Sequence, residues 1–168
     1  MQHLKKILKK RLDNAERIAI LAVGSELRAD DAAGLLVAKK LSQKLAHLDG
    51  RIKIILGETA PENFTGEIRT YKPTHLIILD CAECGLEPGT IQFIDSENVG
   101  GISFSTHMLP LKLMVDYLLS DNHIEVMIIG IQPEVLEFGQ PVSAKIKKTI
   151  NSLANALSKE INLIYSQN

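Results

Sequence analysis

The chain has 168 residues, 45% of them hydrophobic, and a formal net charge of −1 at pH 7. This length suits one domain with a single core, and the balanced charge excludes a nucleic-acid binder that depends on a large excess of basic residues. Because Trp is absent and aromatic residues make up only 4% of the chain, base-stacking surfaces are not expected either.

The N-terminal segment, from Met1 to about Asn14, is predicted to be a basic helix with Leu4, Leu8 and Leu12 on one side. We expect it to pack on the domain, and contact with an acidic partner or a membrane is the alternative. The apolar run at 18–23 is too short for the apolar region of a signal peptide, and no run reaches the roughly 20 residues that cross a bilayer. We therefore expect a cytoplasmic protein without membrane insertion.

The first half of the chain then alternates between strand and helix patterns. Continuous apolar runs at 18–23 and 52–56 predict strands that are buried on both faces. Between them, apolar residues spaced three or four apart from Ala38 to Leu48 predict an amphipathic helix. The segment from Pro61 to Tyr71 suits a shorter helix, because proline is favoured in a first helical turn.

The second half continues the same alternation. Runs at 76–79 and 126–131 predict two further buried strands, whereas residues 90–95 alternate between apolar and polar, which suits an antiparallel strand at a sheet edge. Helical spacing recurs at 108–118 and 142–161. Buried strands that alternate with amphipathic helices predict an α/β fold, a three-layer sandwich around a mostly parallel sheet, with residues 1–168 in one domain.

Several polar residues lie next to the ends of these predicted strands, where open α/β sheets bind ligands. Asp30 and Asp31 precede a helix, Asp80 follows the run at 76–79, and His107 precedes the helix near Pro110. Each has an ordinary explanation. The two adjacent aspartates would cap the helix and complement its dipole, so Asp30→Asn is expected to cost about 1 kcal/mol or less. Asp80 would start a turn, and His107 would be a surface or packed residue.

Together, two carboxylates and one imidazole from separate loops are also suited to bind a divalent transition metal. Imidazole suits nickel, copper, zinc or iron, and three protein ligands leave positions open for water or substrate. A dinucleotide-binding loop is excluded because Gly24 is followed by no further glycine until Gly34, and two acidic residues precede the helix. There is no G-x-S-x-G nucleophile motif.

The only cysteines, Cys81 and Cys84, form one C-x-x-C pair in a stretch that Gly85, Pro88 and Gly89 mark as a loop. A zinc site needs further ligands, and no second pair exists. A structural or incidental pair is the favoured interpretation, and a metal or redox role is the alternative.

Six segments in order support a family resemblance. They are Ile20–Gly34, Gly57–Asn63, Leu79–Ala82, Pro88–Thr90, Ser105–His107 and Gly130–Glu134. Through them, the chain from about Arg17 to Leu157 resembles the hydrogenase maturation endopeptidases, and within these the branch that serves hydrogenase-3-type enzymes. Ser25 stands where the family often has Asn, and Asp31 stands where some members have Glu.

The resemblance implies a phosphorylase/hydrolase-like fold with a twisted five-stranded sheet, to which residues 1–15 add a basic helix outside the family core. It also implies that Asp31, Asp80 and His107 are the metal ligands and catalytic residues. The metal would be nickel that is already inserted into a hydrogenase large-subunit precursor, whose C-terminal extension is then cleaved. No nucleotide or flavin is expected, and the enzyme is expected to be a monomer.

Two questions stay open at this point. Hydrolysis would use either a water activated by the metal or Asp31 or Asp80 as a general base, with nickel positioning the precursor. The same residues also suit a non-proteolytic module, metal-sensing or chaperone-like, that binds the precursor without cutting it. A flavodoxin-like small-molecule domain is the second alternative, and it predicts a copurifying flavin or nucleotide.

Overall fold

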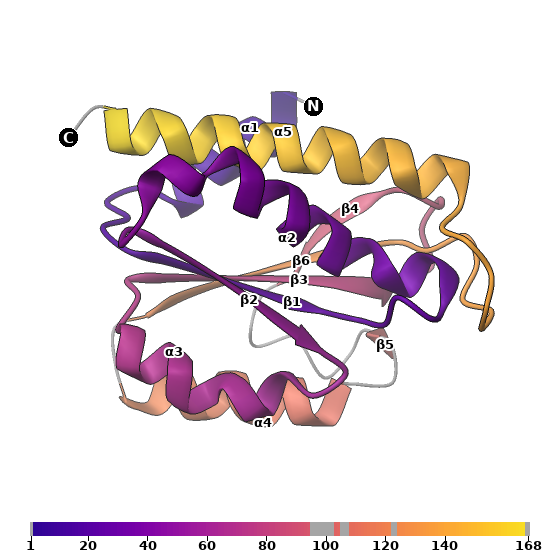
Figure 1. The fold of residues 1–168 in the computed structure, drawn as a ribbon, viewed down its shortest axis with the longest axis horizontal. Coiled ribbons are helices and arrows are strands. Elements are labelled where there is room, and N and C mark those ends of the chain that lie inside the picture. Colours follow the sequence, from indigo (N-terminus) through magenta and orange to yellow (C-terminus); the bar gives the residue numbers. More distant parts are fainter. Residues whose placement is uncertain (1, 95–102, 105–107, 122–123, 167–168) are drawn as a thin grey trace.

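The computed structural model describes residues 2–94, 103–104, 108–121 and 124–166 (Figure 1). Its helices are α1 (Gln2–Arg11), α2 (Ala33–Lys44), α3 (Thr65–Tyr71), α4 (Met108–Asp121) and α5 (Ala144–Ser166), with 3-10 turns η1 (Ala29–Ala32), η2 (Ala46–Leu48) and η3 (Pro61–Phe64). Its strands are β1 (Ile18–Val23), β2 (Ile52–Glu58), β3 (His75–Glu83), β4 (Ile91–Ile94), β5 (Ser103–Phe104) and β6 (Glu125–Ile131). The predicted helices and strands are therefore confirmed, with shifts at their ends.

The main sheet has the strand order β2-β1-β3-β6-β4. The first four strands of this order run parallel, and β4 pairs with β6 in the antiparallel direction at the edge. The edge position and antiparallel direction expected for residues 90–95 are thus confirmed. The short strand β5 was not predicted, and it pairs with the end of β3.

The third strand is longer than its apolar run indicated. It continues past Leu79 to Glu83, because β6 lies beside it and pairs Asp80 with Gly130 and Cys81 with Ile131. The prediction that Asp80 follows the strand is therefore wrong. Asp80 is part of the strand, near its carboxyl end.

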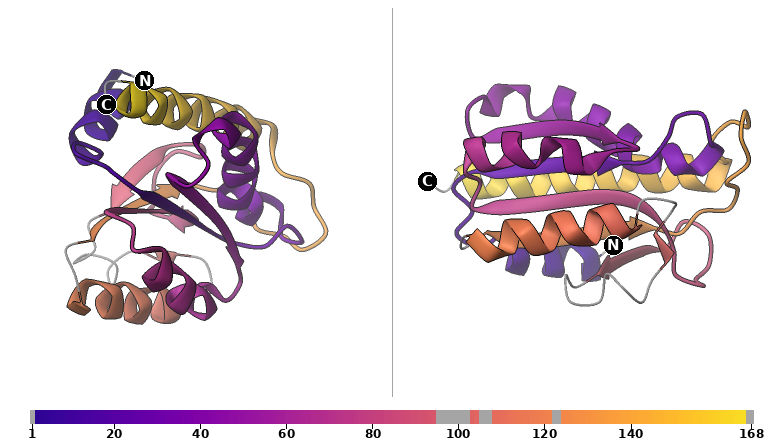
Figure 2. Two further views of the ribbon diagram at one scale, coloured as in Figure 1. Left: turned by 60° about the vertical axis from the view of Figure 1, so that its left-hand side comes forward. Right: turned by 90° about the horizontal axis from the view of Figure 1, so that it is seen from below.

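Helices cover both faces of the sheet, which explains why the central strands are apolar throughout. Helices α2 and α5 lie on one face and α3 and α4 on the other (Figures 1 and 2). All six residues of β1 are buried, and they alternate between the two cores, Ile20 facing one and Leu21 the other. The three-layer α/β sandwich is confirmed.

The basic helix α1 is part of the core on the α2 and α5 face. Leu4, Leu8 and Leu12 are buried there, and α1 packs against α5. The expectation that this helix packs on the domain is confirmed. In the part of the chain that the structure describes, every helix is too short or too polar to span a lipid bilayer.

Candidate active site

Close backbone packing brings η1 against the carboxyl ends of β1 and β3. Gly24 has a φ of +132°, and a Cβ on it would lie 2.0 Å from the backbone oxygen of Asp31. A Cβ on Gly34 would lie 2.4 Å from the backbone oxygen of Leu79. Only glycine permits such approaches. The two glycines therefore set Asp31 beside the segment of β3 that contains Asp80.

Asp31 and Asp80 are fully buried, yet most of their carboxylate oxygens have no hydrogen-bond partner within the described ranges. The Oδ1 of Asp80 accepts a hydrogen bond from the backbone N–H of Cys81 at 2.7 Å. Among the residues that the structure describes, no group hydrogen-bonds to the Oδ2 of Asp80 or to either oxygen of Asp31. Buried carboxylates without partners are costly, and such exceptions call for a functional explanation. Three oxygens are thus available for a proton, a cation or a substrate group.

The electrostatics of the pair favour a bound proton or cation. Burial raises the pKa of Asp80 well above its usual value, the Cys81 N–H bond opposes this shift, and the nearby charge of Asp31 adds to it. A carboxyl group with a raised pKa is suited to exchange protons near neutral pH. A divalent cation would stabilise the ionised pair instead, because it supplies the missing opposite charge.

The two cysteines are free thiols that the environment keeps protonated. Burial raises the pKa of Cys81 far above its usual value, with further contributions from the charges of Asp80 and Asp31. Burial also raises the pKa of Cys84. Since the thiolate is the reactive form, the environment of neither thiol favours a nucleophile. The prediction that both lie in a loop is wrong for Cys81, which lies in β3.

Asp30 has a different role from its neighbour, and the prediction that it caps a helix is wrong. Neither η1 nor α2 has a side-chain cap. The buried carboxylate of Asp30 instead accepts three backbone N–H bonds from the segment between β6 and α5. The donors are Glu134 and Val135, both at 2.9 Å, and Ser143 at 2.7 Å. Asp30 therefore fastens this loop to the segment that contains Asp31.

A second loop anchor, Gln132, was missed by the sequence analysis. Its Oε1 accepts hydrogen bonds from the backbone N–H groups of Cys84 at 2.8 Å and Leu86 at 3.2 Å. This holds the turn after β3 close to the end of β6. The only signal in the sequence was a polar amide directly after a buried strand, which does not indicate the partner.

His107, the third predicted ligand, lies outside the described residues, so its place beside the two aspartates stays a prediction. Within residues 2–94, 103–104, 108–121 and 124–166, no three His, Cys, Asp or Glu side chains gather closely enough to hold a metal ion. The structure thus places two of the three predicted ligands, Asp31 and Asp80, at one buried position.

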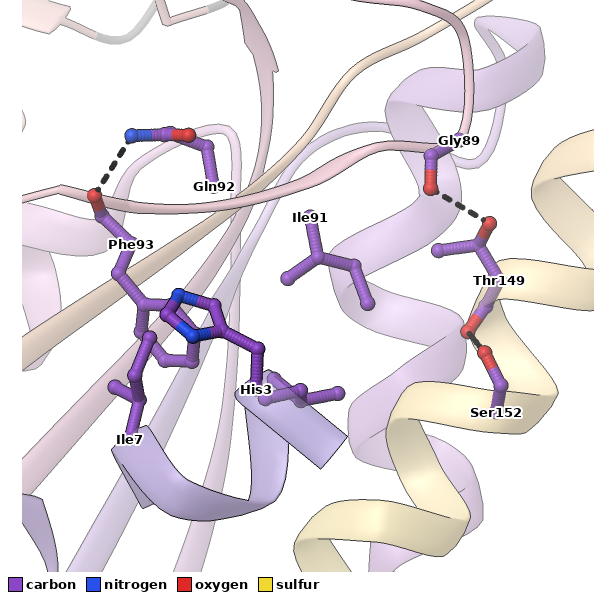
Figure 3. A pocket seen from close by; sticks show the side chains of 9 residues that line it. His3, Ile7, Gly89, Ile91, Gln92, Phe93, Thr149 and Ser152 are labelled. Carbon is purple, nitrogen blue, oxygen red and sulfur yellow. Dashed lines mark hydrogen bonds between the residues drawn. The ribbon is translucent and has the colours of Figure 1, made fainter. Parts of the chain in front are cut away.

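A separate pocket of about 530 Å³ lies between α1, β4 and α5 (Figure 3). Ile91 and Phe93 of β4 point into it, and at one end Thr149 donates a hydrogen bond to the backbone oxygen of Gly89 at 2.9 Å (Figure 3). Neither of the buried aspartates lines it. The pocket is therefore distinct from the candidate active site.

Comparisons with known proteins give a consistent result. A family model described as hydrogenase maturation protease matches residues 35–160. The hydrogenase 3 maturation protease of Escherichia coli K12 is 36% identical over 139 residues, which cover 82% of this chain and 86% of that protein. A putative hydrogenase maturation protease of Methanocaldococcus jannaschii is 36% identical over 159 residues, which cover 92% and 94%.

Solved structures agree with these relatives. The [NiFe] hydrogenase maturation protease HycI from Thermococcus kodakarensis KOD1 superposes with a TM-score of 0.85 at 28% identity, over 93% of this chain and 99% of that one. The crystal structure of a hydrogenase 3 maturation protease gives a TM-score of 0.71 at 35% identity, over 83% and 87%.

Proposed function

As a member of the hydrogenase maturation protease family, the chain is an endopeptidase, and we propose that it removes the C-terminal extension of a nickel–iron hydrogenase large-subunit precursor. We propose further that the precursor is cut only after nickel has been inserted into it. Under this proposal nickel arrives with the substrate, and no nucleotide or flavin takes part.

The observation that supports this proposal is the buried pair of Asp31 and Asp80, three of whose carboxylate oxygens have no hydrogen-bond partner in the part of the chain that the structure describes. Two carboxylates in a dry site repel each other, and a divalent cation offsets that repulsion. A precursor that contains nickel would supply the cation, whereas an empty precursor would leave both charges uncompensated. The pair therefore gives a physical reason for selecting the loaded form, since binding discriminates through a difference in interaction energy.

The same residues provide the proton transfers of peptide hydrolysis. Cleavage requires that a water lose a proton and that the leaving amine gain one. The Oδ2 of Asp80 has no hydrogen-bond partner among the described residues, so this oxygen is available to take up a proton from the water and to return it to the leaving amine. Asp31 and the predicted ligand His107 would orient the loaded precursor at this point. A non-proteolytic binding module is disfavoured, since the Escherichia coli and Thermococcus kodakarensis relatives named above are hydrogenase maturation proteases.

The test is a cleavage assay with intact-mass detection on a large-subunit precursor prepared with and without nickel. We expect loss of a C-terminal peptide only from the loaded precursor, and loss of this activity in Asp80→Asn and His107→Ala. Asp49→Asn changes an acidic residue that is exposed and far from the pair in the chain, and it serves as the control. A stable complex in which the loaded precursor remains intact would refute the proteolytic function.

A further inference from the structure

Two large apolar side chains are exposed on neighbouring loops at the carboxyl end of the sheet. Leu27, between β1 and η1, has 63% of its surface exposed, and Phe138, between β6 and α5, has 74% exposed. The two loops lie side by side in Figures 1 and 2, and the backbone N–H of Gly139 donates to the oxygen of Leu27 at 2.8 Å. We call Leu27 and Phe138, with the backbone that joins them, the apolar lip.

The apolar lip is held in one arrangement by hydrogen bonds to buried groups. The carboxylate of Asp30 accepts three backbone N–H bonds from the Phe138 loop, and its own N–H donates to the oxygen of Val135 at 3.1 Å. Docking on an ordered surface costs less conformational entropy than docking on a loop that must first be ordered. The apolar lip is thus a preorganised surface whose apolar side chains face solvent.

The apolar lip is also continuous with the candidate active site. Leu27 is four residues before Asp31, and the N–H of Asp31 donates to the oxygen of Arg28 at 2.9 Å, so a single hydrogen-bonded turn joins them. A polypeptide bound at Asp31 is therefore separated from Leu27 by only this one turn of the chain. Apolar side chains that stay exposed beside a site gain free energy when a bound chain covers them, and the partner that this site must admit is the precursor.

We propose that the apolar lip is a docking surface for an apolar segment of the hydrogenase large-subunit precursor next to the cleaved bond. This inference rests on the proposed function for the identity of the partner. It adds a contribution that does not depend on nickel, because burial of apolar surface needs no metal. Recognition then has two parts: the apolar lip binds the precursor chain, and the aspartate pair discriminates its metal content.

The test measures binding rather than cleavage, by biolayer interferometry with immobilised precursor in its nickel-free and nickel-loaded forms. The variant combines Leu27→Ser with Phe138→Ser. We expect its Kd to rise about tenfold or more, because a contact residue at the centre of an interface commonly contributes this much. The rise should be the same factor for both forms of the precursor, since independent contributions add. Leu27→Met with Phe138→Leu should restore most of the affinity.

Leu163→Ser is the matched control. This leucine is 44% exposed near the end of α5, roughly 28 Å along the helix from Ala144, at 1.5 Å per residue, and its loss should leave the Kd unchanged. A double-serine variant that melts like the wild type and binds within about twofold of it would overturn the inference. So would a wild-type protein that shows no binding, or a wild-type dimer that the variant dissociates in analytical ultracentrifugation. A wild type that binds the loaded precursor without cutting it refutes the proteolytic function alone.

Discussion

Replacing Asp30 with Asn tests whether this buried carboxylate fastens two loops or merely caps a helix. The side chain keeps its shape, but it loses its charge and exchanges one acceptor oxygen for an NH2 group. The wild-type carboxylate accepts N–H bonds from Glu134 and Val135 on one oxygen and from Ser143 on the other. Whichever way the amide turns, its NH2 group faces at least one of these donors.

The magnitude follows from this geometry. A hydrogen bond to a charged group contributes about 1.5–3 kcal/mol, and a buried donor without an acceptor costs about 1–3 kcal/mol. At least one of the three bonds is lost outright and the others lose their charge, and such effects within one network do not simply add. We expect the free energy of unfolding to fall by about 2–4 kcal/mol, well above the 1 kcal/mol or less of a lost cap.

Urea denaturation followed by circular dichroism measures this free energy by linear extrapolation. Asp49→Asn is the control, because Asp49 is exposed and accepts a single backbone bond from Gly50, so its replacement should cost less than about 0.5 kcal/mol. Hydrogen exchange should show faster exchange of the three donor amides in Asp30→Asn. If Asp30→Asn lowers the free energy of unfolding no more than Asp49→Asn does, and the three amides stay protected from exchange, then the three bonds do not stabilise the protein.

Gly34→Ala should destabilise the protein by about 1–3 kcal/mol in urea, because its Cβ would meet the backbone of Leu79; Gly66→Ala in α3, where nothing lies within 4 Å, should instead stabilise by up to about 1 kcal/mol. Asp80→Asn should stabilise the metal-free protein by about 1–3 kcal/mol at pH 7. The folded state holds the Asp80 proton more tightly than the unfolded state, so the contribution of Asp80 to wild-type stability is lost as pH rises above about 4. The stability advantage of Asp80→Asn over the wild type should therefore disappear near pH 4. Burial lowers the pKa of His75, so the unfolded state takes up the proton first and stability should fall as pH drops below about 6.5. His75→Gln should flatten that dependence in thermal melts across pH 5 to 8, and an unchanged slope would refute it.

The layered fold could be predicted because the pattern along the chain is strong. Continuous apolar runs such as 18–23 predict strands that must be covered on both faces. The segments with helical spacing predict the helices that cover them. The extension of β3 through Asp80 could not be predicted in the same way. A fully buried charged residue contradicts the apolar pattern of a central strand, and only pairing with β6 keeps the strand regular there.

The candidate site, too, could be predicted from the sequence only in part. Asp31 and Asp80 stood out because polar residues beyond the strand ends of an open α/β sheet lie where ligands bind, and a family resemblance pointed to the same two positions. The role of Asp30 was inaccessible, because its hydrogen-bond donors lie more than a hundred residues away. Two adjacent aspartates with the same local context thus have opposite environments, one fully partnered and one without a partner among the described residues.

The packing of α1 against α5 has a consequence for biosynthesis. The leucines on the inner face of α1 belong to the same core as the inner side chains of α5, so α1 is covered by a helix that is made more than a hundred residues later. Such long-range closure slows folding, and partly made chains with uncovered apolar surface are prone to aggregate. The lysines on the outer face of α1 are exposed or partly exposed, and such charge favours the solubility of this segment before α5 has been made.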